Sequence, residues 1–404
     1  MVQCLYLDTA RLGQMSPRAC RASVDLTRFA NKNGPSLYFS QLLQSGFDDW
    51  PDSLKSRYRG LADWSGVATL RSRLKQVTGA APDQECLLAS RSASLVKFAG
   101  RLLFGPCRNV LVTDLSWPAY GRLIARQRVA ASARCSPLAI RKRIFSERLT
   151  EAEVVDVITS AYLAHRCDGL FLPLVDNFGI RLPLKAIVQR IRSLAPLRFV
   201  VVDGAQAIGH IPPELKDNIC DIFIAGCHKW LRGYFPMGVG IFGRPETRGY
   251  IAASLARWKA EGWLDDPLLE FTEQLESGRW KSFGETVQLT PLFTANAACL
   301  DFQRIPQDRR DCITPTNRIL LRHETIPTRW HMMEPHWDFV TDIVLLKQRT
   351  SKQQALPAPH LGQRWLDQSI SVTALSRGLV RLSLPNSTFT DEQLHRVKQA
   401  LLAI

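Results

Sequence analysis

The chain lacks any long hydrophobic run. None of the uninterrupted apolar segments in its 404 residues approaches the roughly 18 residues that a membrane-spanning helix requires. The first residues, "MVQCLYLDTARLG", contain neither the basic region nor the apolar region of a secretory signal. We therefore expect a protein of the cytoplasm that does not enter a membrane.

The chain also lacks the cysteine pattern of a disulfide framework. Its ten cysteines are scattered and show no dense or regular spacing, so we expect reduced thiols. Cys220, Cys227 and His228 lie close together, but no second ligand pair follows at zinc spacing. We therefore predict no metal site.

Acidic residues are fewer than basic ones, at 37 against 52, which gives a formal net charge of +15. The basic residues are spread along the chain rather than clustered with aromatic residues, so attraction of anionic small molecules is favoured over nucleic-acid binding. A basic nucleic-acid binder remains the alternative from a different class. A hydrophobic fraction of 46% and a charged fraction of 22% are typical of a globular protein.

Strand and helix patterns alternate over the first 250 residues. The segment 184–194 places apolar residues at helical spacing with Lys and Arg opposite, and the segment 67–77 does the same before Gly79. Short β-branched or apolar runs follow Asn109, Asp168, Arg198 and Cys220. This order predicts a mostly parallel sheet covered by helices on both faces.

The pattern changes after about residue 250, where the segments are longer and more polar. Residues 304–318 suggest a connection or loop, and "FVTDIVLLK" and "GLVRLSLP" then restore strand-like runs. Thr390 and Gln393 fit a capping box that opens a final helix. We predict a large α/β domain over 46–255, a smaller α+β domain over 256–404, and an N-terminal segment, 1–45, that packs on the small domain.

Polar residues gather where the predicted strands end, which is where an open α/β sheet binds its ligand. Lys229 can form a Schiff base with a carbonyl group, and Asp203 can hold a protonated ring nitrogen. Trp117 offers a flat face for stacking, and the helix start at Ser92 to Ser94 offers N–H groups to a phosphate. Together these features meet the needs of pyridoxal 5'-phosphate.

Two motifs resemble a known family. "VVDGAQAIGHIP" and "CDIFIAGCHKWLRGYFPMGVGIF" look like the core signature of the class V aminotransferases, which are fold type I pyridoxal-phosphate enzymes. The Cys-His-Lys-Trp-Leu wording is closest to the isopenicillin N epimerase-like branch. The resemblance extends from "YLDTARLGQMSPRA" to "GLVRLSLPNSTFTDEQL". It implies a large cofactor domain with a mostly parallel sheet of the seven-stranded type and a smaller C-terminal domain.

The resemblance also implies roles for individual residues towards the cofactor. Lys229 would carry the Schiff base and later move the proton at Cα, and Asp203 would pair with the pyridine nitrogen. Gln206 would approach the phenolic oxygen, and Trp117 would stack on the ring. The phosphate would be held by His228 together with Ser92, Ala93 and Ser94.

Further positions concern the substrate and the partner subunit. Arg381 matches the arginine that binds the substrate carboxylate, and Thr286 matches a residue that reaches the phosphate of the neighbouring subunit, which implies a homodimer. Asp176, next to Asn177, stands where many members have Asn near the phenolic oxygen. An acid at this position should alter the electronics of the aldimine, which puts ordinary aminotransferase chemistry in question. A structural role for Asp176 in a turn is an equal alternative.

The expected reaction acts at Cα of an amino acid through an external aldimine. We expect aminotransferase-type chemistry on a specialised or modified amino acid, with a C–S or other β-elimination lyase, or an epimerase, as alternatives. A homologue that binds the cofactor without turnover also remains open. A cysteine desulfurase is disfavoured because the segment 313–404, which would supply its nucleophile, has no cysteine.

One further motif is misleading. "GVGIFG" at 238–243 satisfies the dinucleotide-binding pattern G-x-G-x-x-G. That motif must open a helix, whereas here the residues are β-like and are followed by Arg244 and Pro245. We predict a glycine-rich return strand there.

Overall fold

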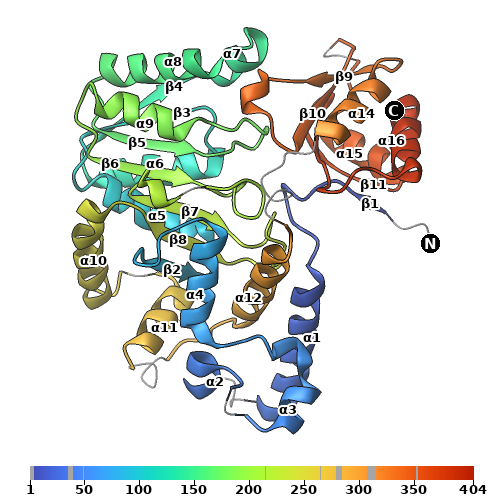
Figure 1. Cartoon of the computed structure of the whole chain (residues 1–404). Coiled ribbons are helices and arrows are strands. Elements are labelled where there is room, and N and C mark those ends of the chain that lie inside the picture. The colour runs from blue at the N-terminus through green and yellow to red at the C-terminus, as the bar shows by residue number, and fades with distance from the viewer. Residues whose placement is uncertain are drawn as a thin grey trace.

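A seven-stranded sheet forms the centre of the computed structural model (Figure 1), which describes residues 4–34, 40–48, 50–213, 215–263, 265–278, 284–306, 315–351 and 354–404. The strand order is β2-β8-β7-β6-β5-β3-β4, and in this sheet β8 runs opposite to the other six strands. The predicted mostly parallel α/β sheet is therefore confirmed. The strands are β2 (Cys86–Ala89), β3 (Asn109–Thr113), β4 (Arg134–Leu138), β5 (Gly169–Pro173), β6 (Phe199–Asp203), β7 (Ile222–Gly226) and β8 (Gly238–Phe242).

Both faces of the sheet are buried, which explains why its strands are continuous apolar runs. In β6, Val200 and Val202 face one hydrophobic core, and Phe199 and Val201 face the other. Helices cover the first core, namely α4 (Gly66–Val77), α8 (Glu151–Ala164) and α9 (Leu184–Arg192). Helices α5 (Ser92–Leu103), α6 (Pro118–Ala130) and α10 (Pro245–Ala260) cover the second.

The local signals noted in the sequence are confirmed. Helix α9 covers the segment predicted from 184, and α4 ends before Gly79, whose φ of +63° is left-handed. The G-x-G-x-x-G segment forms β8, an antiparallel return strand. A Cβ on Gly238 would lie 2.7 Å from the backbone of Arg91, so glycine lets this strand pass close to the start of α5.

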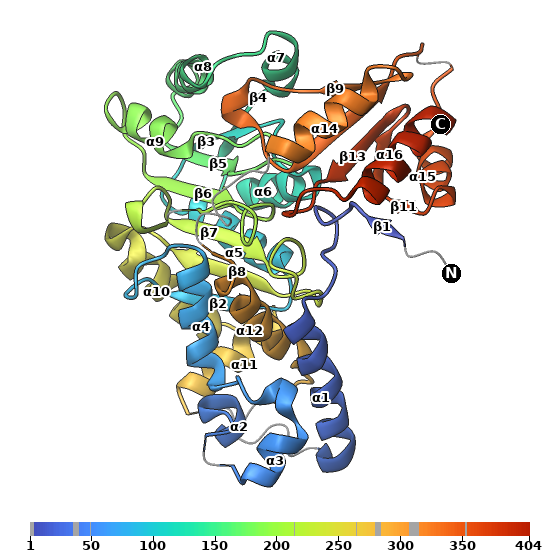
Figure 2. The same ribbon diagram turned by 45° about the vertical axis from the view of Figure 1, so that its right-hand side comes forward.

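The C-terminal unit has its own antiparallel sheet in the order β12-β13-β10-β9 (Figure 2). The two predicted strand-like runs form β10 and β13, and the capping box of Thr390 and Gln393 is present. Of the predicted loop at 304–318, residues 307–314 lie outside the described residues. The elements are β9 (Trp330–Met333), β10 (Ile343–Gln348), β12 (Thr373–Ser376), β13 (Leu379–Ser383), α14 (Pro315–Thr325), α15 (Ala358–Asp367) and α16 (Asp391–Ala403).

The N-terminal segment connects the two units. Strand β1 (Leu5–Tyr6) pairs in parallel with β11 (Ile370–Ser371) of the C-terminal unit. Helix α1 (Pro17–Asn33) then runs down the large unit beside α12 (Thr290–Gln303), near the short helices α2 (Ser40–Ser45) and α3 (Asp52–Arg57) (Figures 1 and 2).

Two helices beyond the predicted boundary at 255 share the core of the large sheet. They are α11 (Pro267–Glu276) and α12, which contribute Leu268 and Phe293 to the same hydrophobic cluster as α4, α8 and α9. Both helices therefore pack with the large unit in the fold. We propose that the smaller unit begins after α12. The division predicted from the sequence is 1–45, 46–255 and 256–404.

Three properties concern the described residues as a whole. All nine cysteines among them are free thiols. No group of three or more His, Cys, Asp or Glu side chains in these ranges could hold a metal ion. No helix in the described part of the chain is long and apolar enough to span a bilayer.

Candidate functional site

A cavity of about 430 Å³ lies at the carboxyl ends of the parallel strands. Strands β3, β5, β6 and β7 point the same way, so the residues that follow them meet at one edge of the sheet. Residues from the N-terminal segment and from the C-terminal unit complete the wall. Nine of the twelve predicted site residues line the cavity: Ser92, Trp117, Asp176, Asn177, Asp203, Gln206, His228, Lys229 and Arg381.

Lys229 and Asp203 form the charged centre of the cavity. Burial lowers the pKa of the Lys229 amine to about 8, although the negative charge of Asp203 opposes this shift. Burial raises the pKa of Asp203 to about 6, against the opposing effects of a hydrogen bond from the Ala205 N–H at 2.9 Å and the Lys229 charge. The amine is thus easily deprotonated near neutral pH, and the carboxylate would gain from a further cationic partner.

The start of α5 forms another wall. Its N-cap residue is Arg91, whose side chain makes no capping hydrogen bond, and the Ser94 N–H donates to the Arg91 carbonyl at 3.1 Å. The N–H groups that open a helix have no partner one turn earlier and can be offered to an anion. Ser92 donates its hydroxyl to the carbonyl of Ala225 at 2.9 Å. A Cβ on Gly226 would lie 2.9 Å from the Ser92 hydroxyl and 3.0 Å from Nδ1 of His228, so both side chains approach the same point.

His228 and Ser94 differ in what surrounds them. Burial lowers the pKa of His228 to about 4, and its Nδ1 is buried without a hydrogen-bond partner among the described residues. Ser94 instead lines a separate cavity of about 70 Å³ beside Phe98 and Trp263. Ala93, its neighbour, is also absent from the lining of the 430 Å³ cavity.

Two aromatic residues of α6 lie at the cavity. Trp117 is the N-cap residue and is 46% exposed, so its ring lies at the rim. Tyr120 lies one turn later and also lines the cavity, where burial and the charge of Asp203 raise the pKa of its phenol. The sequence analysis missed Tyr120, although its i+3 spacing from Trp117 on a helix would have indicated a shared face.

Asp176 has a structural role in a turn as well as a place in the cavity. One carboxylate oxygen accepts N–H bonds from Phe178 and Ile180, both at 2.8 Å. The other accepts a bond from Nε of Arg141 at 3.1 Å, and that guanidinium lies over the Phe178 ring at 4.5 Å from its centre. Burial raises the pKa of Asp176, and the charge of Arg141 opposes the shift.

Arg381 lies at the C-terminal wall and is 4% exposed. Its Nη1 donates to the carbonyl of Asn177 and its Nη2 to the hydroxyl of Thr373, both at 3.3 Å, and Nη2 also lies 3.6 Å from the carboxylate of Asp8. Its Nε is buried with no hydrogen-bond partner in the described part of the chain. Asp8, which the sequence analysis missed, thus orients this guanidinium from the N-terminal segment.

The N-terminal segment also covers the backbone of Lys229. Ala10 and Arg11 line the cavity, and the Gly13 N–H donates to the carbonyl of His228 at 2.8 Å. A Cβ on Gly13 would lie 1.9 Å from the carbonyl oxygen of Lys229, so only glycine allows this close passage. No strand-end signal in the sequence marks these residues, because they follow no strand of the large sheet and reach the site from the N-terminal segment.

Thr286 does not line the cavity and is exposed. Its predicted role concerns a neighbouring subunit, and an exposed side chain is accessible to such a subunit.

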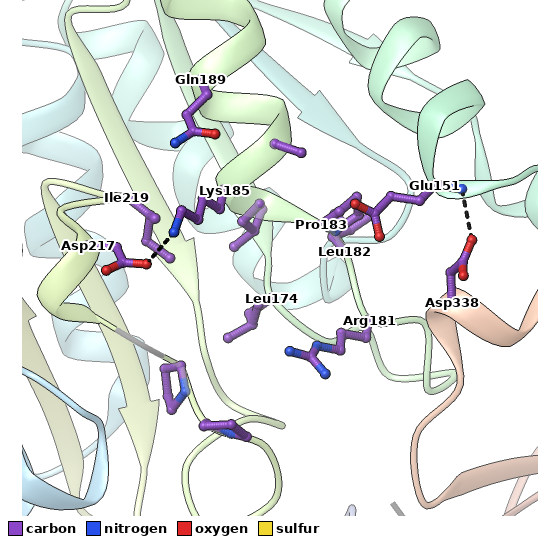
Figure 3. A pocket seen from close by; sticks show the side chains of 14 residues that line it. Glu151, Leu174, Arg181, Leu182, Pro183, Lys185, Gln189, Asp217, Ile219 and Asp338 are labelled. Atoms are coloured by element: carbon purple, nitrogen blue, oxygen red, sulfur yellow. Dashed lines mark hydrogen bonds and ion pairs between the residues drawn. The ribbon is translucent and has the colours of Figure 1, made fainter. Parts of the chain in front are cut away.

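A second cavity, of about 420 Å³, lies between α9 and the segment that carries Asp217 and Ile219, with Asp338 of the C-terminal unit at one edge (Figure 3). Arg181 and Lys185 line it, and Lys185 pairs with Asp217 at 2.8 Å. The backbone N–H of Glu151 donates to Asp338 across its far side, at 3.2 Å. None of the predicted site residues lines this cavity.

Comparison with known families gives one match. The family model described as aminotransferase class-V matches residues 146–253, which include Asp203 and Lys229. The resemblance indicated by the sequence motifs is thereby confirmed.

Curated relatives match parts of the chain. A cysteine desulfurase of Pectobacterium atrosepticum is 25% identical over 195 residues, 46% of this chain and 44% of that protein. The uncharacterized aminotransferase YcbU of Bacillus subtilis is 23% identical over 60% of this chain and 59% of its own. Isopenicillin N epimerase of Amycolatopsis lactamdurans is 34% identical over 97 residues, 24% of this chain and 23% of its own length. The alignments with the first two thus span about half of those relatives.

Solved structures match the whole fold at low sequence identity. A C-DES mutant with glycine covalently linked to its PLP cofactor has a TM-score of 0.69 and 17% identity, over 99% of this chain and 96% of that one. Alanine–glyoxylate aminotransferase from Nostoc sp. has a TM-score of 0.68 and 14% identity, over 99% and 95%. The fold is that of fold type I pyridoxal-phosphate enzymes.

Proposed function

We propose that the chain is a pyridoxal-phosphate-dependent enzyme that acts at Cα of an amino-acid substrate, with aminotransferase-type chemistry on a specialised or modified amino acid. The observation that carries the proposal is the convergence, in one cavity, of a lysine with a lowered pKa and a buried carboxylate with a raised pKa. The class V match over residues 146–253 and the fold of pyridoxal-phosphate enzymes support it.

The described residues fit this cofactor at each end. The Asp203 carboxylate, buried with an N–H bond from Ala205, suits a protonated pyridine nitrogen. The uncapped start of α5 and the buried Nδ1 of His228 suit a phosphate group. Lys229 suits the aldehyde, because its lowered pKa leaves a fraction of the amine neutral and nucleophilic at pH 7 to 8.

When bound, the cofactor supplies an electron sink for the bond broken at Cα. Arg381 would bind the substrate carboxylate through N–H groups that its contacts with Asn177, Thr373 and Asp8 leave free. Once the substrate amine has displaced Lys229, its Nζ would accept a proton and later return it. A pKa near 8 allows both transfers near neutral pH. Trp117, at the rim, would cover one face of the ring and keep water from it.

The cofactor assignment is tested by reduction with borohydride. Purified protein mixed with pyridoxal phosphate should show a visible absorption band that borohydride removes, and peptide mass spectrometry should find the reduced adduct on Lys229. Lys229→Ala should show neither. A protein that remains colourless and unmodified at millimolar cofactor would sink the proposal.

The reaction class is tested by its products. A panel of amino acids should form keto acid only when a keto-acid acceptor is present if the chain is an aminotransferase. Release of keto acid and ammonia from cysteine S-conjugates without an acceptor would favour the β-lyase, and loss of optical activity without keto acid would favour the epimerase. The similarity to C-DES, described as a cystine C–S lyase, supports the β-lyase as the alternative reaction.

We also propose a homodimer whose subunits complete each other's sites through Thr286. This residue is exposed, and the aromatic side chains of Trp117 and Tyr234 are 46% and 40% exposed. Light scattering of the purified protein should give twice the mass of 45.5 kDa. A monomer that still binds the cofactor tightly would contradict the shared site.

A further inference from the structure

Gln206 is held at the cavity by two hydrogen bonds that define its amide orientation. Its Oε1 accepts a bond from the indole Nε1–H of Trp230 at 2.7 Å, and its Nε2 donates to the carbonyl of Ala10 at 2.8 Å. An indole nitrogen only donates and a carbonyl only accepts, so the reversed amide would place donor against donor and acceptor against acceptor. The remaining N–H of Nε2 is therefore the donor that Gln206 can offer to a ligand.

Trp230 is itself fixed by His210. The two rings stack with centres 3.8 Å apart and an interplanar angle of 11°, and Trp230 is 6% exposed. Nδ1 of His210 lies 2.8 Å from the carbonyl of Gln206, and Nε2 accepts the backbone N–H of Asp342 at 3.3 Å. This pattern requires the tautomer with the proton on Nδ1. Burial lowers the pKa of His210 to about 4, so the ring is neutral at pH 7.

These contacts join three remote parts of the chain at one amide. Gln206 follows β6, Trp230 directly follows Lys229, and Ala10 belongs to the N-terminal segment. Ala10 in turn donates its N–H to the hydroxyl of Ser383 in β13, at 2.8 Å. The Gln206 side chain thus lies where the large sheet, the N-terminal segment and the C-terminal unit meet.

We infer that Trp230 is a positioning residue for the proposed reaction, which acts by holding the Gln206 amide with an N–H, not its carbonyl, towards the cavity. The inference rests on the proposed function, because the family resemblance implies that this N–H would be offered to the phenolic oxygen of the cofactor. An N–H donor stabilises the ionised form of that oxygen, whereas a carbonyl in its place would oppose ionisation. His210 supports the indole plane and contacts the backbone of Gln206, but it does not itself line the cavity.

The test uses Trp230→Phe, which keeps a ring for the stack with His210 but has no N–H. The bound cofactor has a visible absorption band that titrates with pH, and the midpoint should rise by one unit or more in the variant. The kcat should fall about tenfold or more, with a smaller change in KM. Trp258→Phe is the matched control, because Trp258 is 4% exposed but packs on Phe98 in the opposite core, away from Gln206. It should leave the midpoint unchanged.

A double variant separates positioning from general packing. If Trp230 acts through Gln206, Gln206→Ala combined with Trp230→Phe should lose no more kcat than Gln206→Ala alone. Losses that multiply, or a midpoint in Trp230→Phe equal to that of the wild type, would overturn the inference.

A measurement on the cofactor-free protein distinguishes failure of the inference about Trp230 from failure of the proposed function. In the cofactor-free protein, the indole N–H of Trp230 should exchange slowly with solvent in NMR spectra, and Gln206→Ala should make it exchange at least tenfold faster. Fast exchange in the wild type would overturn the hydrogen bond itself. A wild-type protein that binds no pyridoxal phosphate would instead overturn the proposed function, whatever Trp230 does.

Discussion

At the scale of the residue, Asp203 shows how a functional group can reduce stability. The residue is 4% exposed, and burial raises the pKa of its carboxyl group from 3.8 to about 6. A carboxyl group with a raised pKa in the folded state binds protons more tightly there than in the unfolded chain. The free energy of unfolding therefore falls as pH rises from about 4 to 6, by about 3 kcal/mol for this shift.

Asp203→Asn should stabilise the cofactor-free protein and impair the enzyme. Asparagine can still accept the N–H of Ala205, but it carries no charge to desolvate. Thermal melting at pH 7.5 should give a higher Tm for the variant than for the wild type, and the difference should vanish near pH 4. Turnover should fall at least a hundredfold, because the ring nitrogen loses its charged partner. A Tm below that of the wild type at pH 7.5 would contradict this account of Asp203.

At the scale of the element, the turn after β5 is organised by the Asp176 side chain, which bonds both to the turn and to Arg141. The Asp176 side chain has no exposed surface and accepts three bonds, two from the turn and one from Arg141 on α7 (Arg141–Ser146). The turn carries Asn177, whose carbonyl contacts Arg381. A change at Arg141 should therefore reach the C-terminal wall of the cavity.

Arg141→Met should destabilise the protein by about 3 to 5 kcal/mol, because it leaves a buried carboxylate without its charged partner. The loss should be larger at pH 8 than at pH 5, since the unpaired acid has a higher pKa in the folded state and escapes part of the cost by protonation. The double variant Arg141→Met with Asp176→Asn should regain most of the stability. Urea unfolding at the two pH values measures both effects, and equal losses for single and double variants would contradict the pairing.

At the scale of the whole molecule, the two units are joined at His210 and the N-terminal segment. His210 follows β6 of the large sheet, and its Nε2 contacts the backbone of Asp342 next to β10. Its pKa is lowered to about 4 by burial and, to a smaller extent, by the positive charges of Arg181 and Arg318. The nearby Asp342 carboxylate, 3.7 Å away, is the acidic group that faces it.

The stability of the cofactor-free protein should fall as the pH falls from about 6.5 to about 4. Between about pH 6.5 and 4 the unfolded chain protonates His210 while the folded protein does not, so the free energy of unfolding drops by about 3 kcal/mol. His228, whose pKa is also lowered to about 4, adds a similar effect.

His210→Phe tests the contribution of this one ring. The variant keeps a stack on Trp230 but lacks the titrating group, so its stability should depend less on pH between 6.5 and 4. It should be less stable than the wild type at pH 7, because two hydrogen bonds are lost. Urea unfolding across the range gives the slopes, and a slope as steep as that of the wild type would exclude His210 as the source.

The sequence by itself determined the sheet and most of the candidate site. Continuous apolar strands such as β6 require helices on both faces, and parallel strands bring their carboxyl ends to one edge. The chemistry of Lys229, Asp203 and Trp117 could therefore be assigned to one edge of the sheet, whereas Arg381 was assigned by the family resemblance. Side-chain type, periodicity and family motifs carry this information because they are local.

Only the tertiary structure decided what holds those residues. Arg141 and Asp176 are 35 residues apart, Trp230 and Gln206 are 24 apart, and Asp8 meets Arg381 from the other end of the chain. No spacing or periodicity predicts such pairs, since they depend on how helices and loops pack. The same reason explains the position of α11 and α12 on the large unit, where burial of their apolar faces against the sheet outweighs their place late in the sequence.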